Sequence, residues 1–164
     1  MIRSTADLAN SVEELYRVFA HYKPGRVTNC TYCWSKDEIE ALLATPLRTI
    51  APELARQLLW ESADHWESAE AYKYFLPRIL EAMTPALSVE DMYPQHIFET
   101  LRALGFGTWH GAENEAVLRF LRALEAMLPS VPGLQSESAQ AEWRIAVESL
   151  RRLSIAPLLL EGPK

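Results

Sequence analysis

The residues best suited to chemistry are two cysteines, Cys30 and Cys33, which are separated by two residues in a predicted loop. Two thiolates at this spacing can both bind one zinc ion, but a closed structural zinc site has four ligands. The other ligands would have to come from distant positions, and the candidates are the histidines His21, His65, His96 and His110. Because this ligand set is incomplete, the sequence favours two structural thiols and no cofactor, with zinc bound by the cysteine pair as the alternative.

A second candidate site is the acidic cluster of Glu61, Asp64, His65 and Glu67. Carboxylates beside an imidazole can hold a divalent metal or act as general acid and base. In a helix, Glu61, Asp64 and His65 would share one face. Carboxylates ahead of a helix also favour its dipole, so the cluster is interpreted as a solvated acidic turn. A metal-dependent hydrolase that uses this cluster or the cysteine pair is the alternative.

A third candidate is the loop that carries Trp109 and His110, followed by Glu113. The spacing is that of a His-x-x-Glu metal site, but Gly107 and Gly111 favour a loop that enters a helix, with Trp109 anchored in the core. The sequence contains no Gly-x-Ser-x-Gly, phosphate-binding loop, His-Glu-x-x-His or dinucleotide fingerprint. No motif therefore assigns a nucleophile or a cofactor-dependent reaction.

Apolar residues at helical spacing run through the elements that must position these candidates. They predict helices after a capping box at Ser35, after Pro52, after an N-cap at Ser68, and after Pro94, as well as over Ala112–Leu128. Gly105 is predicted to be the C′ residue that ends the helix after Pro94. Strand alternation and hairpin turns are missing from the sequence. We therefore expect one all-α domain over residues 1–164, with six or seven helices in an irregular orthogonal bundle or a short helical-repeat-like array.

Three boundaries carry specific expectations. The first helix should begin near Thr5 or Ser11, where side chains can cap it. Pro77 lies inside a helical pattern and lacks an N–H group, so that helix should kink or restart there. The last helix should span roughly Glu137–Leu153, and the apolar tail after it should fold back, because exposed aliphatic side chains are costly.

The segment from the cysteine pair to Glu81 resembles a group of uncharacterised small bacterial helical proteins. Their pattern is a loop Cys-x-x-Cys, a Trp-centred turn and an aromatic run that ends in Phe-Leu-Pro-Arg-x-Leu-Glu. The matching residues are Cys30, Cys33, Trp66, Tyr72, Phe75, Leu76, Pro77, Arg78, Leu80 and Glu81. Glu67 stands where that pattern has a glycine. The resemblance implies a bacterial, cytoplasmic, helical protein and brings no activity or ligand.

The net charge of −6 is concentrated in residues 61–115, which hold three basic and ten acidic residues. This balance disfavours nucleic acid as a partner. No apolar run is long enough to cross a membrane, and the two cysteines with no secretory signal favour the cytoplasm. Aromatic residues beside unbalanced charge suit a protein interface. We therefore expect a non-catalytic protein-interaction module with a basic protein partner. Its candidate binding residues are Asp64, His65, Trp66, Glu67 and Arg78.

Overall fold

A computed structural model describes residues 2–25, 34–60, 68–87 and 94–160 of the 164-residue chain. The described residues form seven α-helices and no strand, so the predicted all-α class is confirmed. The helices are α1 (Ile2–Phe19), α2 (Lys36–Ala44), α3 (Pro52–Trp60), α4 (Ala69–Glu81), α5 (Pro94–Ala103), α6 (Gly111–Glu125) and α7 (Glu137–Leu160). Two short 3-10 helices, η1 (Leu47–Thr49) and η3 (Leu128–Ser130), lie in the connections.

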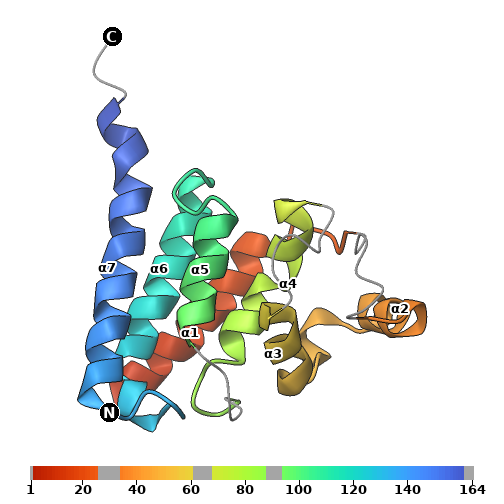
Figure 1. Cartoon of the computed structure of the whole chain (residues 1–164), viewed down its shortest axis with the longest axis horizontal. Coiled ribbons are helices and arrows are strands. Elements are labelled where there is room, and N and C mark those ends of the chain that lie inside the picture. Colours follow the sequence, from red (N-terminus) through yellow and green to blue (C-terminus); the bar gives the residue numbers. More distant parts are fainter. Residues whose placement is uncertain (1, 26–33, 61–67, 88–93, 161–164) are drawn as a thin grey trace.

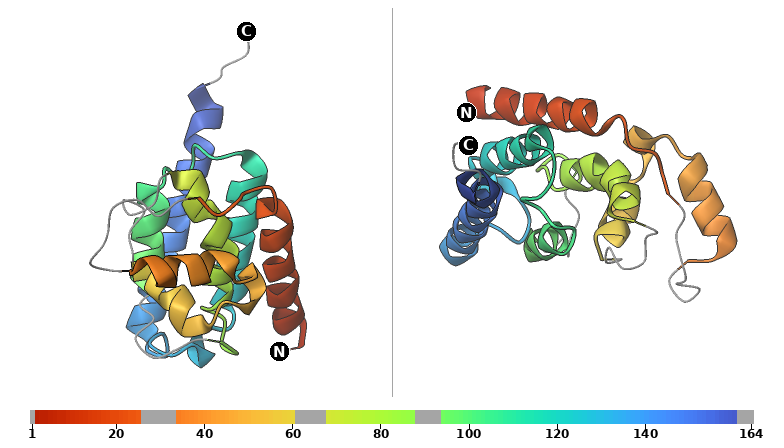
Figure 2. Two further views of the ribbon diagram at one scale, coloured as in Figure 1. Left: turned by 90° about the vertical axis from the view of Figure 1, so that its right-hand side faces the viewer. Right: turned by 90° about the horizontal axis from the view of Figure 1, so that it is seen from above.

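Six of the α-helices form a closed ring of neighbours. Going around the ring, α1 packs on α6, α6 on α7, α7 on α5, α5 on α3, α3 on α4, and α4 on α1 again (Figure 1, and the view from above in Figure 2). The first helix of the chain therefore lies between α4 and α6, which come much later in the sequence. The remaining helix, α2, lies to one side of the molecule, far from α7 (Figures 1 and 2).

The buried apolar side chains of these helices form one continuous cluster, to which all seven contribute. Burial of this apolar surface is the main force that holds the ring together. The largest side chains that are fully buried include Trp143, Tyr72, Phe75 and Phe120. In the part of the chain that the structure describes, no helix is both long and apolar enough to cross a membrane.

Several helix ends follow the local sequence signals. Ser35 caps α2 and forms a complete capping box with Glu38, and the hydroxyl of Ser68 accepts from the backbone N–H of Ala71 at the start of α4. Gly105 has a φ of 75° after α5. Its N–H donates to the carbonyl of Arg102, and the next N–H donates to the carbonyl of Leu101. These two bonds form a Schellman motif, which places Gly105 at the C′ position as predicted.

The start of α1 differs from the expectation. This helix begins at Ile2 and passes straight through Ser11, whose buried hydroxyl donates to the carbonyl of Leu8, 2.7 Å away. Ser11 therefore caps nothing. Its side chain is satisfied within the helix, in the back-bonded arrangement that serine adopts at interior helix positions.

The predicted restart at Pro77 and the predicted fold-back of the C-terminal tail do not occur. Helix α4 contains Pro77 in its interior and does not restart there, so of the two predicted outcomes only the kink stays a prediction. Residues 75–80 around Pro77 are all buried. Packing on every side thus offsets the hydrogen bond that proline cannot make. The tail after Leu153 does not fold back but continues α7 to Leu160, so that the helix extends past the ends of its neighbours (Figures 1 and 2).

Candidate functional site

Arg78 is the one predicted binding residue that the structure describes. Its side chain is buried; Nε donates to the carbonyl of Ile50 over 2.7 Å, and Nη1 donates to Oε2 of Glu81 over 2.6 Å. Arg78 thus joins α4 to the segment after η1 and does not present its charge on an open surface. The other predicted residues, Cys30, Cys33, Asp64, His65, Trp66 and Glu67, lie outside the described residues.

Glu81 extends this contact to the first helix. Its Oε2 accepts a second hydrogen bond, 2.7 Å long, from the hydroxyl of Tyr16 on α1. Burial and the neighbouring carboxylate raise the pKa of Tyr16, which therefore remains a protonated donor. The guanidinium of Arg48 lies 3.8 Å from the centre of the Tyr16 ring. The whole group connects α1, η1 and α4.

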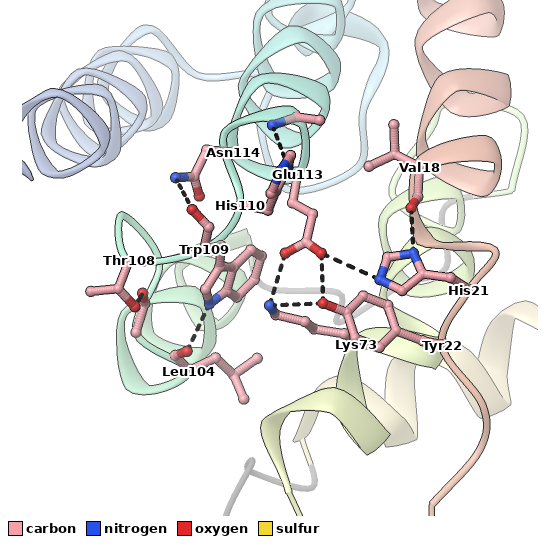
Figure 3. A network of polar contacts seen from close by, with 12 residues as sticks. Val18, His21, Tyr22, Lys73, Leu104, Thr108, Trp109, His110, Glu113 and Asn114 are labelled. Atoms are coloured by element: carbon pink, nitrogen blue, oxygen red, sulfur yellow. Dashed lines mark hydrogen bonds and ion pairs between the residues drawn. The ribbon is translucent and has the colours of Figure 1, made fainter. Parts of the chain in front are cut away.

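A second polar cluster is centred on Lys73 of α4 and Glu113 of α6 (Figure 3). Both side chains are almost excluded from solvent, at 8% and 5% exposure, and Nζ lies 2.8 Å from Oε2. The same Nζ donates to the hydroxyl of Tyr22 over 3.2 Å and lies 4.3 Å from the centre of the Trp109 ring. The hydroxyl of Tyr22 donates in turn to Oε1 of Glu113 over 2.5 Å.

Each member of this Lys73–Glu113 cluster is held by its own element. Glu113 lies in the first turn of α6, where the helix dipole favours a negative charge. Trp109 is buried and donates its ring N–H to the carbonyl of Leu104 over 2.8 Å, so the prediction that it anchors the core is confirmed.

His110 caps α6 by accepting from the N–H of Ala112. His110 and Glu113 therefore have separate partners, and the spacing that suggested a metal site serves the start of a helix.

His21 marks the solvent-facing side of the Lys73–Glu113 cluster. Its Nε2 lies 3.7 Å from Oε1 of Glu113, and Nδ1 lies 3.0 Å from the carbonyl of Val18 (Figure 3). Burial and the bond to Glu113 raise the pKa of Tyr22, which keeps this phenol protonated as a donor. The ammonium of Lys73 contacts a carboxylate, a phenol and a ring face. This arrangement connects α1, α4 and α6 and leaves the amine engaged as an ion-pair partner.

Sequence reasoning did not single out Lys73. It is a lone cation among Tyr72, Tyr74 and Phe75, in the most aromatic stretch of the chain. A lysine among aromatic residues is expected to be buried, and a buried charge seldom lacks a partner. This reasoning could have indicated that Lys73 forms an ion pair. The sequence offered ten acidic residues in the same region and nothing to select Glu113 among them.

The histidines were also candidate metal ligands. No group of three or more His, Cys, Asp or Glu side chains occurs in the described ranges. The His96 ring packs on the Trp60 ring, with centroids 4.0 Å apart, while His21 and His110 belong to the contacts above. The zinc site at Cys30 and Cys33 and the hydrolase site near Asp64 involve residues outside these ranges and stay predictions.

A different candidate surface lies on α7. Four large apolar side chains are exposed among the residues described, and Ile145, Leu153 and Ile155 of α7 are three of them. Ile145 is the most open, at 70%. We call the solvent-facing row formed by Ala141, Ile145, Glu148, Arg152 and Ile155 the outer face of α7. The opposite side of this helix buries Trp143, Val147 and Leu150.

The charges on the outer face of α7 are paired within the helix. Glu148 accepts from Arg151 over 2.7 and 2.8 Å and from Arg152 over 3.2 Å. These two guanidinium groups lower the pKa of Glu148 to about 2, so the carboxylate stays ionised at any physiological pH. The row therefore combines aliphatic side chains at its two ends with a fixed negative and a fixed positive charge between them.

Comparisons with known proteins add no further constraint: no protein-family model matches the chain, and no curated protein or solved structure matches it. The resemblance to small bacterial helical proteins accordingly stays a prediction.

Proposed function

We propose that this chain is a non-catalytic protein-interaction module and that the outer face of α7 is its interaction surface. The observation that carries the proposal is the exposure of Ile145 and Ile155 on this face of a helix that extends past the rest of the fold (Figure 1). Aliphatic side chains exposed together on one element are typical of surfaces that bind another protein. The fourth exposed apolar residue, Trp60, differs because the ring of His96 packs against it.

The buried polar clusters also support this proposal, because their charged groups serve contacts between helices. The charged groups of Lys73, Arg78 and Glu113 are committed to contacts between helices, so they hold the scaffold that carries α7. A rigid scaffold lowers the entropic cost of binding, because the surface is ordered before its partner arrives. The use of only two cysteines supports a cytoplasmic setting for this module.

A photo-crosslinking experiment tests the proposed function. A photoreactive amino acid is placed at Ile145, and in a control variant at Glu115 of α6, which is also well exposed at 58%. After irradiation in the cells that produce this chain, adducts are identified by mass spectrometry. We expect a defined protein adduct from position 145 and none from position 115. Equal labelling from both positions, or none from either, would contradict the proposal.

A further inference from the structure

The spacing of the outer face of α7 matches that of a helix that pairs with another helix. Ala141, Ile145, Glu148, Arg152 and Ile155 follow one another at intervals of four, three, four and three residues. This is the a/d spacing of a heptad, which keeps one seam of a helix directed at its neighbour. The seam points away from the buried side of α7, and it is long enough to present about four turns to a partner.

The seam is also complementary to itself. Ile145 and Glu148 lie five and two positions before Leu150, while Ile155 and Arg152 lie five and two positions after it. In an antiparallel pair centred on Leu150, each Ile145 would face Ile155 of the other copy, and each Glu148 would face Arg152. A parallel pair would place Glu148 against Glu148 and Arg152 against Arg152, and like charges at such positions disfavour pairing.

We infer that the partner of the outer face of α7 is a second copy of this chain, bound antiparallel about a two-fold axis that crosses the outer face at the level of Leu150 along the helix. The inference rests on the proposed function and names its partner. In the dimer the Ile145 and Ile155 side chains pack across the axis at both ends of the seam. Between them, the two Glu148 and two Arg152 side chains form one cluster of alternating charge.

The neighbouring elements leave this seam open. On one side of α7, Ser149 accepts from Arg102 of α5 over 3.3 Å, and on the other side Arg144 bonds to Glu125 at the end of α6 over 3.0 Å. Both contacts flank the outer face and do not cover it, since the Arg152 side chain between them is 77% exposed. A two-fold contact is isologous, so the same residues serve both copies and the assembly closes at two.

The first test measures the mass of the purified full chain in solution by light scattering. We expect twice the chain mass of 18.6 kDa at about 100 µM, and the single-chain mass for Ile145→Glu, which places a charge in the apolar layer. Glu115→Lys on α6 serves as a control and should remain dimeric. Far-UV circular dichroism verifies that each variant is folded.

The second test reverses the charges of Glu148 and Arg152, and it can refute the inference even if Ile145→Glu fails to fold. Glu148→Arg makes the centre of the seam wholly positive, and Arg152→Glu makes it wholly negative, so each variant alone should dimerise at least about tenfold more weakly. An equimolar mixture of the two should form a heterodimer, and the double variant Glu148→Arg/Arg152→Glu should regain dimerisation. A wild-type monomer at about 100 µM, or charge variants that all dimerise like wild type, would overturn the inference.

The two proposals fail in different ways. A monomeric purified chain, together with a crosslink from position 145 to a different protein, would refute the self-association and leave the proposed function standing. A crosslink from position 145 to a second copy of the chain supports both, and the loss of any crosslink refutes both.

Discussion

At the scale of single residues, the buried pair of Lys73 and Glu113 makes the sharpest stability prediction. Glu113→Gln leaves the Lys73 ammonium without its counter-charge in a site closed to water, so we expect the free energy of unfolding to fall by about 3–5 kcal/mol. Replacing both residues, as Lys73→Met with Glu113→Leu, removes both charges and should cost less than the single change. Urea unfolding followed by circular dichroism measures both effects.

A surface pair provides the matched control for that experiment. Lys36 and Glu40 on α2 are 3.6 Å apart but largely exposed, at 87% and 67%. Glu40→Gln should therefore change stability by less than about 0.5 kcal/mol. A comparable cost for Glu40→Gln and Glu113→Gln would show that burial of the Lys73–Glu113 cluster contributes nothing.

Tyr22 makes a prediction about alkaline pH. Because its pKa is raised in the folded protein, Tyr22 keeps its proton when an ordinary tyrosine, with a pKa near 10, has lost it. The folded state then binds more protons than the unfolded state, so the stabilisation is complete below about pH 10 and declines as the pH rises above that value. The ultraviolet change of tyrosinate between about pH 9 and pH 11 should be equal in wild type and Tyr22→Phe. A smaller change in the variant, with both proteins folded by circular dichroism, would contradict the raised pKa.

At the scale of elements, Gly107 shows how the loop before α6 fits against α7. Gly107 has a φ of 103°, and a Cβ atom built there would lie 2.7 Å from the carbonyl oxygen of Leu153. Gly107→Ala should therefore lower stability by more than about 1 kcal/mol through both backbone strain and the clash. Gly111→Ala at the start of α6 is the control, because its Cβ would meet nothing within 4 Å. Thermal unfolding of the two variants should show a clear loss only for Gly107→Ala.

The elements themselves differed in how well the sequence predicted them. The Ser35 and Ser68 caps and the Gly105 stop are local signals, formed by side chains that bond within one turn of the helix they end, and all were confirmed. The predicted restart of the helix at Pro77 was wrong, because packing from other helices decides whether a helix continues through a proline. The length of α7 was misjudged because the cost of exposing aliphatic side chains was expected to fold the tail back, whereas the backbone continues as helix to Leu160.

The residues of the candidate site were likewise predictable where a local signal placed them and unpredictable where tertiary packing did. Trp109 could be placed in the core from its type and its loop, and the structure confirms this. The pairing of Lys73 with Glu113 could not be found, because 40 residues separate them and only the arrangement of α1, α4 and α6 brings them together. The sequence analysis interpreted the acidic segment, residues 61–115, as one interaction surface. In the structure Glu113 is buried and Glu81 is bound to Arg78.

At the scale of the whole molecule, the ring of helices determines which surface remains for a partner. Helix α1 packs on α4 and α6, and α3, α4 and α5 each pack on two others. Helix α7 also packs on two neighbours, α5 and α6, but it continues past them (Figure 1). Its buried side closes the ring through Trp143 and Leu150, which leaves the outer face turned to solvent.

If two copies join through this face, thermal stability must depend on protein concentration. Dimer formation stabilises the folded state by mass action, so raising the concentration from about 5 µM to about 500 µM should raise the unfolding midpoint of the wild type by a few degrees. Ile145→Glu should show no such rise, because a folded monomer unfolds independently of concentration. Glu115→Lys, which changes an exposed charge on α6, should behave like the wild type. Differential scanning calorimetry measures the three midpoints, and a concentration-independent midpoint in the wild type would count against assembly through α7.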